Sequence, residues 1–223
     1  MSLPAADIRA LIFDFDGLIL DTEVAIFEAW RELYAGHGFT LTIETWAQCV
    51  GSDFGHYDPQ VELEQFVGRT LDWAPLIDQR RKRVTEILTG KDAMPGVRAR
   101  LQEATDHGLL CAVASSSSHS WVDGWLGRLG IDHHFRSTTC LEDTGKAKPD
   151  PSLFLHAAES LGVNPSEAVV LEDSLNGLRA AHAAGMRCIV VPCEITKHLA
   201  FEGAWRQAGS LEEFTVPELM GRA

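Results

Sequence analysis

The sequence predicts an α/β fold, in which a doubly wound, Rossmann-like parallel sheet forms the core and an all-helical cap domain is inserted after the first strand. Ala10–Phe13 form a short apolar run, whose length suits a strand that is buried on both faces. After Pro95 helical and extended patterns alternate, which indicates parallel strands with right-handed crossovers. Residues 22–90 show no convincing strand pattern. We therefore expect a core of residues 1–19 and 92–223 and a cap of residues 20–91.

The expected cap is built from helices. In residues 22–36, apolar side chains recur every three or four positions, as they do on one face of a helix. Further helices are expected over residues 41–51, 61–71 and 76–88, with a break at residues 57–59. We expect Trp30, Trp46 and Trp73 to pack the cap core; alternatively, one of them lines the pocket. The cap should close over the strand ends as a lid, about hinges near residues 18–22 and 89–94.

The expected core elements alternate along the rest of the chain. The helices are residues 97–107, 119–129, 151–161 and 175–184, and the strands are residues 109–114, 135–140, 168–171 and 188–191. Polar residues follow three of the strands. Because open α/β sheets bind ligands at the carboxyl ends of their strands, we expect the functional site there.

Composition limits the classes of partner and the compartment. The formal net charge is −13, which disfavours non-specific binding of nucleic acid. No apolar run approaches the roughly 20 residues that cross a bilayer, and no basic start leads into an apolar signal segment. The cysteines are odd in number and form no CxxC pair; they are Cys49, Cys111, Cys140, Cys188 and Cys193. We expect a reduced, cytoplasmic protein that binds neither nucleic acid nor membrane and is a monomer, with a homodimer as the alternative.

Two carboxylates directly follow the first expected strand. Asp14 and Asp16 are separated by one residue, and Gly17 permits both a turn and a close approach of a ligand to the backbone. Buried carboxylates are costly unless a cation or hydrogen bonds compensate them. The simpler alternative is that both residues only end the strand and start a turn. Three later segments favour a functional site, because they supply the missing partners.

The first two of these segments suit an anion. Ser115 and Ser116 lie in a serine run between an expected strand and an expected helix, where hydroxyl and free N–H groups bind anions. Ordinary helix capping by serine is the alternative. Lys148 lies in a loop that proline stiffens, and from there it can reach a phosphoryl oxygen as a point charge. A solvated loop lysine is the alternative.

The third segment suits a cation. Glu172 and Asp173 follow the apolar run of residues 168–171, so a second buried strand ends in acidic residues. Mg²⁺ prefers oxygen ligands, which Asp14, Asp173 and Glu172 would supply. Alternatively, Asp173 or Ser174 caps the helix that starts at residue 175, and the two roles are compatible.

Taken together, these segments form a family pattern. The chain contains, in this order, FDFDGLILDTE, ASSS, KPDP and LEDSLNG. This combination resembles the haloacid dehalogenase superfamily of phosphotransferases, in the branch with a helical cap after the first strand. Within that superfamily the chain is similar to the β-phosphoglucomutase-like group of sugar-phosphate and nucleotide phosphatases. The matching stretches span nearly the whole chain.

The resemblance implies an Mg²⁺-dependent phosphatase that hydrolyses a small phosphate monoester, either a sugar phosphate or a nucleoside monophosphate. A carboxylate such as Asp14 can attack phosphorus and form an aspartyl-phosphate, while Asp16 acts as general acid and then as general base. The catalytic residues are expected to be Asp14, Asp16, Ser115 and Lys148. The expected phosphate-binding residues are Gly17, Ser115, Ser116 and Lys148. The expected Mg²⁺ ligands are Asp14, Asp16 through its backbone carbonyl, Asp173 and Glu172.

Three other activities remain to be weighed. Dehalogenases of this superfamily lack the second aspartate, so Asp16 disfavours dehalogenation. The β-phosphoglucomutases carry a histidine twelve residues after the nucleophile, where this chain has Ile26, and cationic residues around a cap glycine. If that glycine is Gly51, its neighbour is Val50 and the arginine position is Phe54, so both cations are missing. A phosphomutase therefore ranks second, and a non-catalytic α/β binding protein ranks third.

Some polar residues give weaker signals. One cation of the basic run at residues 80–83 can lie over the substrate, although a solvated helix face is the favoured interpretation of the run. His119 can face the substrate or be a polar residue at a helix start. His133 and His134 are adjacent rather than at the spacing of metal ligands, so we expect them on the surface.

Overall fold

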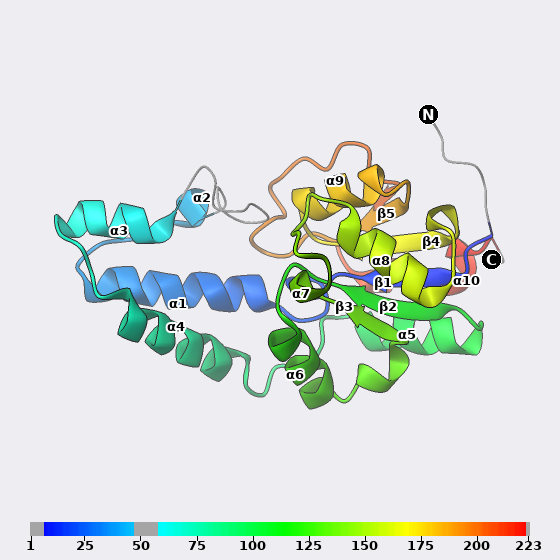
Figure 1. Cartoon of the computed structure of the whole chain (residues 1–223), viewed down its shortest axis with the longest axis horizontal. Coiled ribbons are helices and arrows are strands. Elements are labelled where there is room, and N and C mark those ends of the chain that lie inside the picture. The colour runs from blue at the N-terminus through cyan, green and yellow to red at the C-terminus, as the bar shows by residue number, and fades with distance from the viewer. Residues whose placement is uncertain (1–6, 47–57, 222–223) are drawn as a thin grey trace.

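The core of the protein is a parallel sheet. The computed structural model describes residues 7–46 and 58–221, and within these ranges six strands form one sheet in the order β3-β2-β1-β4-β5-β6 (Figure 1). The strands are β1 (Ala10–Phe13), β2 (Leu110–Ala114), β3 (Ser137–Thr139), β4 (Ala168–Glu172), β5 (Arg187–Val190) and β6 (Arg206–Gln207). Every neighbouring pair is parallel. The expected doubly wound α/β fold is therefore confirmed, and its strand order reverses between β1 and β4.

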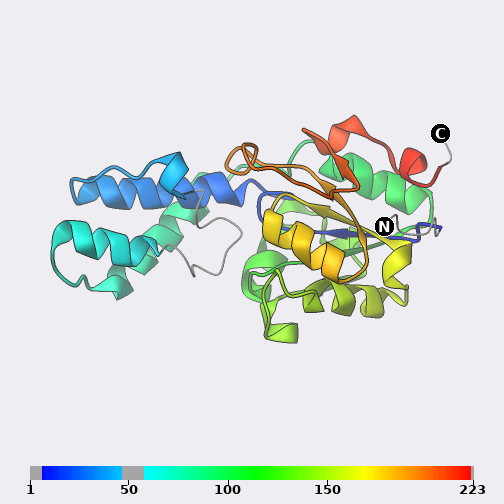
Figure 2. The same ribbon diagram turned by 90° about the horizontal axis from the view of Figure 1, so that it is seen from above.

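Strand β1 shows why the central strands are apolar throughout. Leu11 and Phe13 belong to the apolar cluster on one face of the sheet, whereas Ala10 and Ile12 belong to the cluster on the other face. The first face is covered by α5 (Val97–Asp106), α6 (His119–Leu129) and α10 (Val216–Leu219), and the second by α8 (Ser152–Leu161) and α9 (Leu175–Ala183). Figure 2 shows the sheet between these two layers. With both faces covered, side chains on both sides of the strand are removed from water.

The described part of the insert is helical, as expected. Its helices are α1 (Thr22–Gly36), α2 (Ile43–Trp46), α3 (Pro59–Val67) and α4 (Trp73–Leu88), and they lie together at one end of the molecule (Figures 1 and 2). Trp30 and Trp46 are buried in their common apolar cluster, and Trp73 packs against it. The expected packing role of these three side chains is confirmed. Helix α3 starts where Asp58 accepts a hydrogen bond from the N–H of Gln60.

The cap helices are joined to the core by apolar contacts. Ala29 of α1 and Leu88 of α4 belong to the same cluster as the sheet residue Phe13. In return, Cys193 and Ile195, which follow β5, are buried in the cap cluster. The expected hinge motion and the domain boundaries at residues 19/20 and 91/92 stay predictions, since a single arrangement of cap and core tests neither.

A few elements differ from those expected. Strand β6 was not predicted, because two residues carry no readable alternation. Strand β3 is shorter than the expected residues 135–140. The second half of the expected helix 41–51, together with Cys49, Val50, Gly51 and Phe54, lies outside the described residues. The short elements not expected are α7 (Leu141–Thr144) and the 3₁₀ turns Asp132–His134, Pro165–Glu167 and Leu211–Glu213. No described helix is long and apolar enough to span a membrane.

Candidate active site

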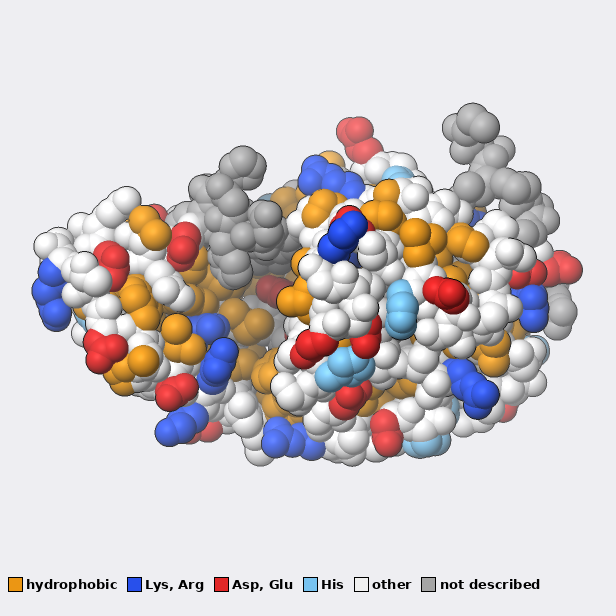
Figure 3. All heavy atoms as spheres, in the orientation of Figure 1, with side chains coloured by type: hydrophobic (Ala, Val, Ile, Leu, Met, Phe, Trp, Pro, Cys, Tyr) orange, Lys and Arg blue, Asp and Glu red, His pale blue; other side chains and the backbone are white. Residues whose placement is uncertain are grey.

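A pocket of about 960 Å³ lies where the strand ends meet the cap helices. Figure 3 shows the hollow between the two parts of the molecule, with Lys and Arg side chains on its cap side. The predicted residues that line the pocket are Asp14, Asp16, Ser115, Ser116, Lys148, Glu172 and Asp173. They come from segments far apart in the chain, and the parallel sheet brings them together because β2, β1 and β4 are neighbours. The pocket lies at the reversal of strand order, where open α/β sheets bind ligands.

Lys148 links two of the buried carboxylates. Its Nζ lies 2.5 Å from Oδ1 of Asp14 and 2.7 Å from Oε1 of Glu172, and all three side chains are buried. Burial lowers the pKa of Lys148, but the carboxylates of Asp14 and Glu172 outweigh this effect and raise the pKa above its usual value. The backbone N–H of Lys148 donates to Oγ of Ser116 across 3.1 Å, so the lysine loop also contacts the serine loop. The lysine is thus a fixed, buried cation at the base of the pocket.

Glu172 accepts hydrogen bonds at both of its oxygens. Its Oε1 accepts from Lys148, whereas its Oε2 accepts from the N–H of Asp173 (2.9 Å) and from the N–H and hydroxyl of Ser174 (2.8 and 2.9 Å). Gly177 of α9 leaves room for this carboxylate, because a Cβ atom there would overlap it. The position of Glu172 is therefore set by the strand end, the first turn of α9 and Lys148 together.

A set of carboxylate oxygens is suited to a metal ion. Asp14, Glu172 and Asp173 each offer an oxygen, and these atoms all lie within 4.8 Å of one another. Oδ2 of Asp173 is buried and has no hydrogen-bond partner. It faces Gly17, which has a φ of +80° and at which a Cβ atom would overlap Asp173. A divalent cation would satisfy the unpartnered oxygen, so the donors present fit a hard metal ion.

The pKa values of this cluster also indicate an excess of negative charge. Burial raises the pKa of Asp14 to about 8, even though Lys148 beside it acts in the opposite direction. Burial and the neighbouring Glu172 raise the pKa of Asp173 well above its ordinary value. Glu23 of α1 behaves like Asp14: burial, Asp16 and Asp14 raise its pKa to about 8. One lysine therefore does not compensate these acids, and a further cation would stabilise their charged forms.

Asp16 is held by donors from the segment that follows β2. Its Oδ2 accepts from the hydroxyl of Ser117 (2.6 Å) and, more weakly, from that of Ser115 (3.4 Å). Its Oδ1 accepts from the indole N–H of Trp121 across 3.0 Å. Sequence reasoning missed Ser117 and Trp121. Ser117 belongs to the serine run and could have been included, whereas the contact of Trp121 depends on the direction of α6.

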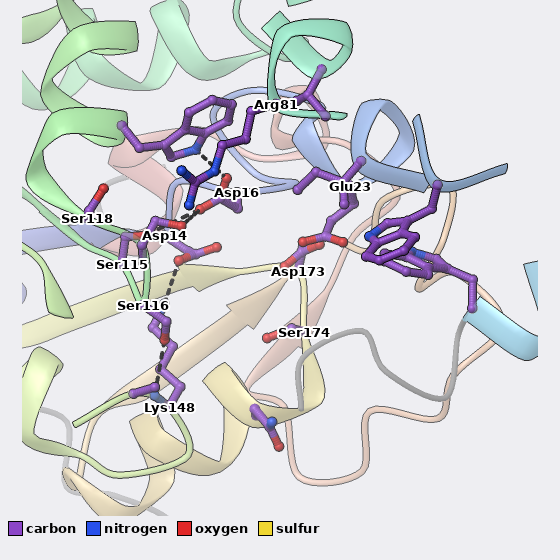
Figure 4. Close-up of a pocket in the computed structure, with 18 of the residues that line it drawn as sticks. Asp14, Asp16, Glu23, Arg81, Ser115, Ser116, Ser118, Lys148, Asp173 and Ser174 are labelled. Carbon is purple, nitrogen blue, oxygen red and sulfur yellow. Dashed lines mark hydrogen bonds and ion pairs between the residues drawn. The ribbon is translucent and has the colours of Figure 1, made fainter. Parts of the chain in front are cut away.

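The cap supplies cationic and aromatic side chains to the pocket. Arg80 and Arg81 of α4 line it, and the Arg81 side chain extends toward Asp16 (Figure 4). Arg80 packs over the ring of Trp30 at 4.9 Å, and Trp30 and Trp46 also line the pocket. Arg83, in contrast, pairs with Glu32 on the exposed surface. The basic run of residues 80–83 thus supplies cations to the pocket and also forms part of a solvated helix face.

The three histidines that the sequence singled out, His119, His133 and His134, do not line the pocket. His119 is bonded to Asp123 (3.0 Å) and Asp143 (2.8 Å) and is not among the pocket residues, so it is a polar residue at the helix start. His133 is exposed, as expected, and His134 is half-buried beside it.

Comparison with known proteins identifies the family. The family described as haloacid dehalogenase-like hydrolase matches residues 11–191. The chain belongs to the haloacid dehalogenase-like hydrolases. Among relatives of this hydrolase, "Putative phosphatase YhcW" of Bacillus subtilis is 40% identical over 213 residues, which cover 96% of each chain. The fructose-1-phosphate phosphatase YqaB of Escherichia coli is 33% identical and covers 81% of this chain and 95% of its own.

Solved structures of related hydrolases share the fold. CbbY from Rhodobacter sphaeroides in complex with phosphate has a TM-score of 0.73 and 30% identity, and covers 92% of this chain and 96% of its own. A HAD family hydrolase from Deinococcus radiodurans with bound phosphate and sodium has a TM-score of 0.77 and 26% identity over 97% of each chain. The expected family and the expected class of enzyme, a phosphatase of the haloacid dehalogenase type, are confirmed.

Proposed function

We propose that this chain is an Mg²⁺-dependent phosphatase that hydrolyses a small phosphate monoester through an aspartyl-phosphate on Asp14. The observation that carries the proposal is the cluster at the ends of β1 and β4. There the Asp14 carboxylate, the Lys148 ammonium group and the unpartnered Oδ2 of Asp173 meet in one pocket. Phosphoryl transfer needs a nucleophile, a fixed positive charge and an oxygen that is free to bind a metal ion.

The metal would be held mainly by Asp14 and Asp173. The backbone carbonyl of Asp16 and the carboxylate of Glu172 are further proposed ligands, but Glu172 already accepts hydrogen bonds at both oxygens and holds Lys148. We therefore favour the anchoring of Lys148 as the main role of Glu172. Bound Mg²⁺ offsets the repulsion between the anionic nucleophile and the anionic substrate and orients both.

The reaction would proceed in two steps. In the first, an Oδ of Asp14 attacks phosphorus, the bond to the substrate oxygen breaks, and Asp16 gives its proton to the leaving alcohol. In the second, Asp16 takes a proton from water, the water oxygen attacks phosphorus, and phosphate leaves with Asp14 regenerated. Lys148, Ser115 and the backbone N–H groups near Gly17 and Ser116 would hold the phosphoryl oxygens.

For the substrate we propose a sugar or sugar-alcohol phosphate. The pocket wall contributed by the cap offers Glu23 and Gln60, which can bind hydroxyl groups, and the flat rings of Trp30 and Trp46. Arg81 lies on the same side and would bind a polar or anionic group of the substrate (Figure 4). The relatives named for fructose-1-phosphate and hexitol phosphatase activity support this class. A nucleoside monophosphate is the alternative.

A phosphomutase is the second candidate activity. A mutase must return the phosphoryl group to a sugar, and the family pattern uses a histidine where this chain has Ile26. Ile26 lines the pocket, where it can neither exchange a proton nor donate a hydrogen bond. We therefore expect water to be the usual acceptor. The corresponding argument from Val50, Gly51 and Phe54 concerns residues outside those described.

We propose a monomeric, cytoplasmic enzyme whose partner is a small phosphorylated substrate and not nucleic acid or membrane. The four described cysteines, Cys111, Cys140, Cys188 and Cys193, are all free and buried, which suits a reducing compartment. Light scattering of the purified protein tests the monomer.

The activity is tested with p-nitrophenyl phosphate and with a panel of sugar phosphates and nucleoside monophosphates, each with Mg²⁺ and with EDTA. Mg²⁺-dependent release of inorganic phosphate is expected, with sugar phosphates preferred. Absence of turnover on every substrate would favour the non-catalytic binding protein. Phosphorus NMR distinguishes a phosphomutase from a phosphatase, with β-glucose 1-phosphate as substrate and the 1,6-bisphosphate as primer. Formation of an isomerised sugar phosphate with little free phosphate would contradict the phosphatase proposal.

A further inference from the structure

The carboxylate of Asp16 accepts hydrogen bonds of two different kinds. At Oδ2 the donors are the hydroxyls of Ser117 (2.6 Å) and Ser115 (3.4 Å), and at Oδ1 the donor is the indole N–H of Trp121 (3.0 Å). Among the described residues no other side chain forms a hydrogen bond with this carboxylate. Both oxygens are thus fixed by the segment that runs from the end of β2 into α6.

The indole of Trp121 is held in place by packing. Its ring meets that of Trp125 edge-on, with centroids 5.7 Å apart and an angle of 73°. Trp125 is itself buried, and the guanidinium of Arg128 lies over its ring at 4.7 Å. Trp121 also packs against the apolar cluster on this face of the sheet and lines the pocket. The direction of its N–H is therefore set by α6 and not by Asp16.

The two kinds of donor differ in what they allow. A serine hydroxyl can rotate and can either donate or accept a hydrogen bond, whereas an indole N–H only donates. While Trp121 donates to Oδ1, that oxygen has to accept, whether the carboxyl group is charged or neutral. Of the donors to Asp16, only the serine hydroxyls at Oδ2 can turn and change from donor to acceptor.

We propose that Trp121 is a positioning residue that holds the Asp16 carboxylate in the orientation from which it acts as general acid and base. The proposal rests on the role of Asp16 as general acid and base given above. By donating to Oδ1, Trp121 fixes the plane of the carboxyl group, which in the proposed reaction exchanges a proton with the leaving alcohol and with water. Trp121 itself does not touch the transferring phosphoryl group in this scheme.

The test uses Trp121→Phe, which keeps an aromatic ring in place and removes the N–H. Two substrates separate proton transfer from binding. Fructose 1-phosphate releases a strongly basic alkoxide that needs a proton, whereas p-nitrophenyl phosphate releases a weakly basic phenolate that does not. We expect kcat for fructose 1-phosphate to fall about tenfold, the effect of losing one hydrogen bond to an ionisable group. KM for both substrates and kcat for p-nitrophenyl phosphate should stay within about twofold.

Two controls complete the test. Trp125→Phe removes the same N–H from the neighbouring ring, which has no hydrogen bond to Asp16, and it should leave the ratio of the two kcat values unchanged. Asp16→Asn should lower turnover of fructose 1-phosphate more than that of p-nitrophenyl phosphate. Equal losses on both substrates in Trp121→Phe, or no loss on either, would overturn the role of Trp121 and leave the proposed function intact. Full turnover of fructose 1-phosphate by Asp16→Asn would overturn the proposed role of Asp16 and this inference together.

Discussion

Lys148 donates a hydrogen bond to Glu172 across 2.7 Å, and both side chains are buried. The same ammonium group also bonds to Asp14, so one lysine faces the two carboxylates that flank the base of the pocket. This arrangement helps to keep two acidic strand-end residues, Asp14 and Glu172, in a folded core. We therefore expect Lys148 to affect both the stability of the protein and its affinity for Mg²⁺.

Replacing this lysine tests that dependence. Lys148→Met leaves Asp14 and Glu172 without their cation, so the free energy of unfolding in EDTA should fall by roughly 3–5 kcal/mol, as when one partner of a buried pair is removed. Added Mg²⁺ should raise the melting temperature of the variant more than that of the wild type, because the metal replaces the missing charge.

A matched control lies in the same loop. Lys146 pairs with Asp150 at 3.3 Å on the exposed surface, so Lys146→Met should cost less than about 1 kcal/mol. Denaturant unfolding measures both losses. Equal losses of unfolding free energy in the two variants would show that the buried contacts of Lys148 stabilise the protein no more than an exposed pair does.

Gly177 tests the position of Glu172. In Gly177→Ala the new Cβ would overlap the Glu172 carboxylate, which has to move and take Lys148 with it. We expect turnover of p-nitrophenyl phosphate to fall at least tenfold, on the order of one lost charged contact. Gly124→Ala is the control, since a Cβ atom there meets nothing within 4 Å and alanine favours the helix by about 1 kcal/mol. Wild-type turnover in Gly177→Ala would contradict the proposed anchoring of Lys148.

His119 should make stability depend on pH. Burial alone would lower the pKa of His119, but its hydrogen bonds to Asp123 and Asp143 outweigh this and raise the pKa above 6.5. Because the pKa of the folded state is the higher one, the stabilisation is complete below the unfolded pKa and is lost as pH rises through the folded pKa. The melting temperatures of wild type and His119→Gln should therefore differ most near pH 5.5 and converge above about pH 8. The side chain is 36% exposed, so solvent screening keeps the difference small. A difference that grows with pH would refute this account.

Metal binding can be measured without turnover. Mg²⁺ at about 100 times its dissociation constant should stabilise the wild type by about 2.7 kcal/mol through mass action, and EDTA should reverse the effect. In Asp173→Asn the stabilisation should be largely lost, because the unpartnered oxygen is removed. Ca²⁺ should bind as well but inhibit turnover moderately, since its larger and looser shell displaces the nucleophile. An unchanged Mg²⁺ effect in Asp173→Asn would place the metal elsewhere.

The sequence predicts the site residues that lie at the ends of parallel strands, because these ends meet at one edge of the sheet. Asp14 and Asp173 could be placed at the same edge of the sheet because each lies at the end of an apolar run that predicts a parallel strand. Lys148 was less certain, because a loop lysine looks the same in sequence whether it is solvated or, as here, buried between two carboxylates.

The remaining contacts depend on packing that no local pattern encodes. Trp121 reads as an ordinary helix residue, and only the direction of α6 turns its N–H toward Asp16. The basic run of α4 divides between pocket and surface because successive helix residues face different sides, which places Arg81 and Arg83 apart. Strand β6 is too short to produce a periodic signal.

The central claim is that the substrate phosphoryl group passes through a covalent bond to Asp14. In the Asp16→Asn variant the second step should be slow, so mixing it with p-nitrophenyl phosphate and Mg²⁺ should accumulate the aspartyl-phosphate. Borohydride reduces an acyl phosphate to the alcohol, and mass spectrometry of the quenched protein should then find homoserine at position 14. Asp14→Asn should show no such product and a loss of turnover of at least ~10³. An unmodified Asp14 in samples that release phosphate, or activity of Asp14→Asn within tenfold of the wild type, would contradict the account.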